Sequence, residues 1–167
     1  ADGVASVLWR HDARTTNGFN LAFGTPAKLL RAYARPERRE VEIEEAPEPL
    51  FVLANDRVGS PEFPKAERAE ALARAALDRA ESPAQIAKLL ADHEEPPLSR
   101  VTPPPPGARF GIDFVQRLQA LCIHTESYGT VSSTTLAWDA DGHVSRYFFA
   151  AGPPCTHAHE DVSGLLA

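Results

Sequence analysis

The residues best suited to bind a metal ion occur late in the sequence, in the run Cys155-Thr156-His157-Ala158-His159. In an extended strand, His157 and His159 would share one side. Thiolate and imidazole ligands suit zinc, and haem iron uses either group as an axial ligand. A closed zinc site needs four ligands, however, and the sequence shows no second ligand cluster. We therefore favour a polar tail after Pro153-Pro154 and keep Cys155, His157 and His159 as candidates.

Cys122 and His124 are separated by one residue and would point to one face of a strand. The apolar run around Cys122 favours a buried structural thiol. A histidine in this position is more often a hydrogen-bonded strand residue than a ligand. Two cysteines are too few for a disulfide scaffold, which predicts a reducing, cytoplasmic setting.

The composition is that of an ordinary globular domain. The chain has 167 residues, is 43% hydrophobic and 24% charged, and carries a net charge of −6. Without a basic stripe, a nucleic acid or an anionic membrane surface is not an expected partner. No apolar run approaches the roughly 20 residues of a membrane-spanning helix. The chain contains no Met and opens at Ala1 without a signal-peptide pattern, so we expect a fragment or a processed chain.

The apolar spacing predicts an α+β chain, expected to be a single domain over 1–167 or the C-terminal portion of one. Helices are expected over 4–10, 65–80, from 82 onward and over 114–121; strands are expected over 19–23, 29–33, 41–43, 50–53 and 121–125, and in a hairpin over 128–149. The run 50–53 is apolar on both faces, which predicts a central strand. The Pro-rich stretch 94–108 is expected to be a linker or lid within the fold.

Three stretches resemble one known family, in order and in spacing. They are "NGFNLAFG" (17–24), "LAND" followed by "PEFPKAER" (53–68), and "YGTVSSTTLAWDADGHV" (128–144). All three resemble the NRDE family, also called the transport-and-Golgi-organisation-2 family, and they cover the C-terminal two-thirds of a member. The family resembles the N-terminal nucleophile hydrolases, whose fold is an αββα sandwich of layered antiparallel sheets. The resemblance implies that this chain supplies part of such a sandwich, completed by a missing N-terminal segment or a second chain.

The resemblance also implies candidate pocket residues. Asn55, expected at a strand end, would be an oxyanion donor in a hydrolase, although a capped turn is the favoured interpretation. Asn17 and Asn20 bracket Phe19 and could line a pocket, but Asn17-Gly18 favours a tight turn. Tyr128 and Thr130 are candidate hydrogen-bonding groups, for which we favour strand packing.

The same comparison argues against catalysis by this chain as given. Nucleophile hydrolases attack through a Cys, Ser or Thr at the first position, and Ala1 has no nucleophile. Val131 stands where family members usually carry Arg, and an isopropyl group cannot replace a cation.

Three hypotheses follow. The first, which the resemblance implies, is binding or trafficking of haem or of a lipid or acyl ligand in a cleft between the sheets, with no required cofactor. The second is a cysteine amidohydrolase or acyltransferase whose nucleophile lies on a segment absent from this chain. The third is an inactive scaffold for protein contacts.

Overall fold

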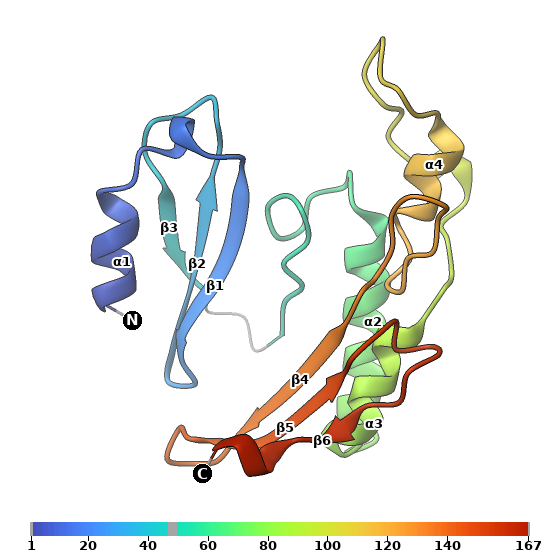
Figure 1. The fold of residues 1–167 in the computed structure, drawn as a ribbon. Coiled ribbons are helices and arrows are strands. Elements are labelled where there is room, and N and C mark those ends of the chain that lie inside the picture. The colour runs from blue at the N-terminus through green and yellow to red at the C-terminus, as the bar shows by residue number, and fades with distance from the viewer. Residues whose placement is uncertain (1, 47–49, 167) are drawn as a thin grey trace. The chain divides into compact units, whose positions relative to one another are not determined.

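The structure is a computed structural model that describes residues 2–46 and 50–166. The chain divides into two compact units, unit 1 (residues 1–60) and unit 2 (residues 61–167). Each unit contains helices and one three-stranded antiparallel sheet (Figure 1). The predicted α+β class is therefore confirmed.

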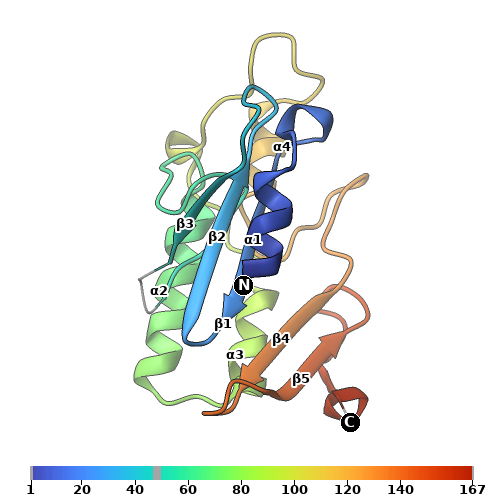
Figure 2. The same ribbon diagram turned by 90° about the vertical axis from the view of Figure 1, so that its left-hand side faces the viewer.

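Unit 1 is a sheet with one helix on its face. Its elements are α1 (Asp2–Trp9), a 3-10 turn η1 (Ala13–Thr15), β1 (Phe19–Thr25), β2 (Lys28–Ala34) and β3 (Glu42–Glu45), with strand order β1-β2-β3. Leu8 of α1 packs in a core with Ala32 and Ala34 of β2. Figures 1 and 2 show α1 lying along one face of this sheet. The helix expected over 4–10 and the strands expected over 19–23 and 29–33 are thus confirmed.

The β1–β2 hairpin depends on a glycine of β1 next to its turn. Thr25 pairs with Lys28, so the strands continue almost to the connection. Gly24 has φ +143°, and a Cβ there would lie 2.2 Å from the Lys28 carbonyl oxygen. Only glycine adopts this conformation at so close a backbone approach.

The central strand predicted over 50–53 is wrong. These residues are half-buried but form no strand, and Asn55 is exposed in the bend that follows. The Asn20 side-chain amide donates hydrogen bonds to the Ala54 and Asp56 carbonyl oxygens, at 2.5 and 3.0 Å. A side chain of β1, rather than a strand ladder, therefore attaches this segment. A short apolar run does not by itself distinguish these two arrangements.

Unit 2 combines helices with a second sheet. Its elements are α2 (Pro64–Asp78), α3 (Pro83–Ala87), η2 (Lys88–Ala91), η3 (Leu98–Arg100), α4 (Ile112–Arg117), β4 (Ser133–Trp138), β5 (Val144–Ala150), β6 (Glu160–Asp161) and η4 (Ser163–Leu166). The strand order is β4-β5-β6, and α3 packs against β4 and β5. Ser82 begins α3 with its backbone N–H donating to Gln85 Oε1 at 2.9 Å, as the capping pattern predicts.

Two expectations for unit 2 change. The strand predicted over 121–125 is a turn closed by a single bridge between His124 and Gly129. The polar tail expected after Pro153-Pro154 contains a short strand, β6, which pairs with β5. The predicted hairpin is confirmed as β4 and β5, joined by a turn in which Gly142 has φ +85°. No helix among the described residues is long and apolar enough to cross a lipid bilayer.

We predict that Asn20→Ala lowers the free energy of unfolding by about 1.5 kcal/mol, because it leaves two carbonyls of the 54–56 segment unpaired. It also removes the acceptor of a 2.8 Å hydrogen bond from Arg35. Urea unfolding followed by circular dichroism measures the change. The matched control is Asn17→Ala, at an exposed position three residues away, with an expected change within about 0.5 kcal/mol. Equal effects of the two substitutions would contradict the assignment.

Candidate metal centre

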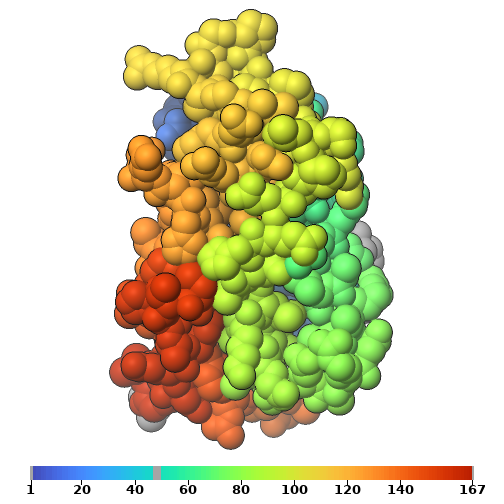
Figure 3. Space-filling model, turned by 90° about the vertical axis from the view of Figure 1, so that its right-hand side faces the viewer, coloured from blue at the N-terminus to red at the C-terminus, as the bar shows by residue number. Residues whose placement is uncertain are grey.

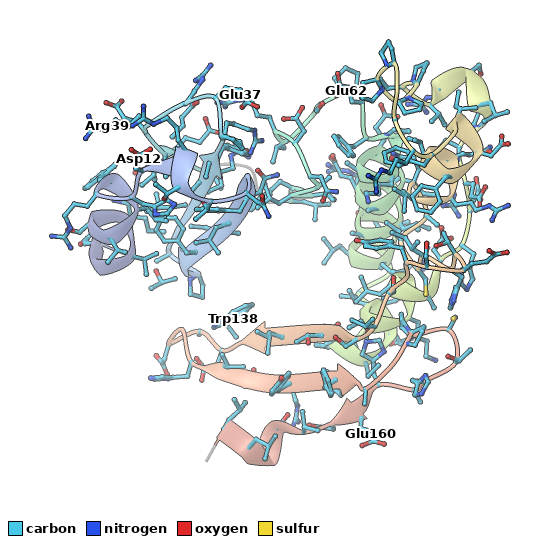
Figure 4. The ribbon with its side chains drawn as sticks, turned by 45° about the horizontal axis from the view of Figure 1, so that its top comes forward. Asp12, Glu37, Arg39, Glu62, Trp138 and Glu160 are labelled. Carbon is cyan, nitrogen blue, oxygen red and sulfur yellow. The ribbon has the colours of Figure 1, made fainter. Side chains whose placement is uncertain are left out.

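Four side chains with metal-ligating atoms meet in unit 2. His93 follows η2, Cys122 and His124 belong to the turn over 121–130, and Cys155 lies in the loop over 151–159 between β5 and β6. Their ligand atoms all lie within 4.8 Å of one another. Figure 4 shows the two sulfur atoms, in yellow, near each other. We call these four residues the tetrad.

The distances within the tetrad are short. Cys122 Sγ lies 3.7 Å from Cys155 Sγ and 3.6 Å from His124 Nε2, and His124 Nε2 lies 3.1 Å from Cys155 Sγ. The His93 and His124 rings have centroids 5.0 Å apart and are tilted by 41°. Cys122 is only 1% exposed, whereas the other three residues are exposed. The tetrad is therefore buried at Cys122 and accessible to solvent at its other three residues.

The turn that presents Cys122 and His124 is fixed by its backbone. Ile123 and Thr130 pair twice: the Ile123 N–H donates to Thr130 Oγ1, and the Thr130 N–H donates to the Ile123 carbonyl oxygen, both at 2.9 Å. A Cβ at Gly129 would lie 2.8 Å from that same carbonyl oxygen, so the turn needs glycine there. The candidate hydroxyl of Thr130 thus has a structural partner beside Cys122.

His93 is oriented from two sides. The Cys122 N–H donates to the Asp92 carbonyl oxygen at 2.8 Å, and His93 Nδ1 lies 3.0 Å from the Cys122 carbonyl oxygen. Because a carbonyl oxygen only accepts, this contact requires a proton on Nδ1. A neutral His93 then keeps its lone pair on Nε2, which is the form that binds a metal ion.

Arg68 of α2 holds the residue before His93. Its guanidinium donates to both carboxylate oxygens of Asp92, at 2.7 and 2.6 Å. This hydrogen bonding is the largest cause that lowers the pKa of Asp92. Such bidentate pairs are strong and geometrically specific. The pair therefore ties the exit from η2 to the first turns of α2.

Cys155 is presented by a tight turn. The Thr156 and His157 N–H groups both donate to the Pro153 carbonyl oxygen, at 3.0 and 2.9 Å. The His157 ring packs onto Gly152, where a Cβ would lie 2.3 Å from Nδ1. Glycine at 152 is thus required for this position of the ring.

The protonation of two groups is shifted. Burial raises the pKa of the Cys122 thiol, and its hydrogen bond with Cys155 raises it further. A metal ion that binds Cys122 must therefore displace a proton from the thiol. Burial lowers the pKa of His159, which favours its neutral imidazole.

A groove adjoins the tetrad. It has a volume of about 430 Å³, and its lining comprises Ala84, Lys88, Ala91, Pro154, Cys155, Thr156, His157, Ala158 and His159. Figure 3 shows the segment around 85–90 beside the loop over 151–159 on one face of unit 2. Cys155 is the one residue of this lining that also belongs to the tetrad.

The structure divides the cysteines and histidines predicted as possible ligands between the tetrad and the groove. Cys155 lies in the tetrad together with Cys122 and His124, for which the sequence favoured structural roles. His157 and His159 line the groove instead. His93 carried no signal in the sequence, because it is 29 residues from Cys122 and belongs to no recognisable ligand spacing.

The candidate pocket residues lie elsewhere. Asn17, Asn20 and Asn55 belong to unit 1, where the Asn20 amide attaches the 54–56 segment. Tyr128 is 58% exposed and does not line the groove. Val131, which the resemblance found in the sequence places where an Arg is expected, is 80% exposed. The oxyanion-donor role of Asn55 and the pocket roles of Asn17, Asn20, Tyr128 and Thr130 stay predictions.

Fold and site together define an α+β protein with a cluster of thiols and imidazoles in its C-terminal unit. A sequence model of the Transport and Golgi organisation 2 family matches residues 4–148. The chain belongs to that family, which confirms the resemblance found in the sequence. Comparison with curated proteins found no match, and comparison with solved structures found none.

We predict that Arg68→Met destabilises the protein by about 2 kcal/mol, because it leaves the partly buried Asp92 carboxylate without its bidentate partner. The matched control is Arg74→Met on the same helix. Arg74 pairs with Glu70 at 2.7 Å, but both side chains are largely exposed, so the expected loss is within about 0.5 kcal/mol. Urea unfolding of the two variants measures the difference. Similar losses would show that the Arg68–Asp92 pair contributes no more than a surface ion pair.

Proposed function

We propose that this member of the Transport and Golgi organisation 2 family binds haem as a transported ligand, in the groove beside α3 and the loop over 151–159. One observation carries the proposal. The groove lining combines a thiol and two imidazoles with small apolar side chains, and all of them lie within unit 2. This combination matches the two needs of haem, which are a ligand for its iron and an apolar surface for its ring.

The lining offers three candidate iron ligands. Haem iron is held in proteins by an imidazole or a thiolate, and the groove contains His157, His159 and Cys155. His157 is exposed, and His159 is half-buried with Nε2 2.7 Å from Ser133 Oγ. Two imidazoles on one loop, one exposed and one half-buried, allow iron to be held and released at the surface of unit 2, which suits a transported ligand.

The rest of the lining suits the other parts of the haem molecule. Ala84, Ala91, Pro154 and Ala158 supply apolar contact for a flat ring. Lys88 supplies a cation for a propionate group. A lipid or acyl ligand is less favoured, because an acyl chain forms no specific bond with the thiol and the two imidazoles that the loop over 151–159 contributes to the groove.

We predict that the reduced full chain binds hemin with a shifted Soret band at one hemin per chain. The double substitution His157→Ala and His159→Ala should weaken binding at least about tenfold, because it removes both imidazoles of the groove. His143→Ala is the control, since His143 is an exposed histidine of the β4–β5 turn and does not line the groove. Absorbance titration measures the affinities.

Two results would contradict the proposal. One is the spectrum of free hemin throughout the titration. The other is equal affinity of the wild type, the double variant and the His143→Ala control, which would indicate non-specific adsorption. Binding of a fluorescent fatty acid by a protein that leaves hemin free would support the lipid alternative instead.

A further inference from the structure

We infer that the tetrad of His93, Cys122, His124 and Cys155 is a binding site for one zinc ion. The inference does not require haem binding, because three of these four residues lie outside the groove. Its basis is the agreement between the tetrad and the geometry and chemistry of four-coordinate zinc.

The two distances from Cys122 Sγ fit a tetrahedral ion. With Zn–S bonds of about 2.3 Å and Zn–N bonds of about 2.0 Å, two sulfurs lie roughly 3.8 Å apart and a sulfur and a nitrogen roughly 3.5 Å apart. The corresponding distances are 3.7 Å between the sulfurs and 3.6 Å from Cys122 Sγ to His124 Nε2. The 3.1 Å contact of His124 with Cys155 needs only a small opening. Exposed side chains can make these adjustments without a change of fold.

The ligand types select the ion. Two thiolates and two neutral imidazoles form an S₂N₂ set, which in tetrahedral arrangement favours zinc over magnesium or calcium, whose ligands are oxygens. Two thiolate charges neutralise Zn²⁺, so the complete site carries no net charge. A neutral site is compatible with the burial of Cys122 at 1% exposure.

The surroundings of the tetrad resemble the support that zinc ligands receive. Ligating histidines usually donate their second ring N–H to a carbonyl or carboxylate, and His93 Nδ1 contacts the Cys122 carbonyl oxygen in this way. The Arg68–Asp92 pair fixes the backbone next to His93. The Thr130 contact and Gly129 fix the turn that carries Cys122 and His124. Three of the four ligands are thus positioned before any ion binds.

Zinc would join segments that are distant in the sequence. Cys122 is 29 residues from His93 and 33 residues from Cys155. A bound ion would link the exit from η2, the turn over 121–130 and the loop over 151–159. Because the ion binds only the folded arrangement, it stabilises unit 2 by mass action.

The test uses the reduced full chain, stripped of metal with a chelator and then desalted. Titration with Zn²⁺ against a chromophoric chelator should give one zinc ion per chain. Co²⁺ in place of Zn²⁺ should show the intense visible bands of a tetrahedral ion together with a thiolate-to-cobalt charge-transfer band. Zinc should also slow the reaction of Cys155, the exposed thiol, with iodoacetamide.

The variants that carry the test are His93→Gln and His124→Gln, because both residues are exposed and their substitution need not disturb the core. Each should weaken zinc binding at least about 100-fold by removing one ligand. His143→Gln is the matched control, the same substitution at an exposed histidine outside the tetrad, and it should leave the affinity within about twofold. Circular dichroism confirms that each variant is folded.

Several outcomes would overturn the inference. One is a reduced protein that binds no zinc, with the two thiols instead oxidising readily to a Cys122–Cys155 disulfide. Another is zinc affinity that survives His93→Gln and His124→Gln but is lost on substitution of His157 and His159, which would place the ion in the groove. A negative hemin titration would leave the zinc result intact, since His93 and His124 do not line the groove.

Discussion

Unit 2 depends on a two-point contact between the backbone around Asp92 and that of Cys122. The Cys122 N–H donates to the Asp92 carbonyl oxygen at 2.8 Å, and the His93 ring returns a hydrogen bond to the Cys122 carbonyl oxygen at 3.0 Å. This contact joins the helical half of the unit to the turn that leads into its sheet. Arg68 extends the connection to α2 through the Asp92 carboxylate. The same contact brings His93, Cys122 and His124, three of the four residues of the tetrad, close together.

Local patterns predicted the elements well where a periodic side-chain pattern ended in a specific turn. The β4–β5 hairpin follows from alternation around a glycine-containing turn, β1 follows from alternation, and α2 follows from its apolar spacing. The strand predicted over 50–53 is wrong because the adjoining segment is attached to β1 by hydrogen bonds from the Asn20 side chain. A single side-chain contact of this kind produces no periodic pattern in the sequence. The two-residue strand β6 is similarly invisible, since its pairing depends on where the chain returns to β5.

The tetrad could be predicted only in part, for a topological reason. Cys155, Cys122 and His124 were recognisable as residues with metal-ligating atoms, but no pattern of spacing connects them with His93. Zinc motifs that are readable in a sequence place ligands in pairs on one turn, whereas three segments contribute here. Their meeting point is set by long-range contacts such as Arg68 with Asp92, 24 residues apart. Such contacts become visible only in the folded chain.

Cys155 connects the two proposals, because it belongs to both the tetrad and the groove lining. A zinc ion bound to its thiolate would make the sulfur unavailable to haem and would leave His157 and His159 as the candidate iron ligands of the groove. At the same time, a metal bond to Cys155 restrains the loop over 151–159, which forms one side of the groove. Zinc occupancy would thus decide both the kind of iron ligand and the rigidity of the loop that presents it. Gly152 limits the freedom of this loop further, because the His157 ring occupies the space that a side chain at position 152 would need.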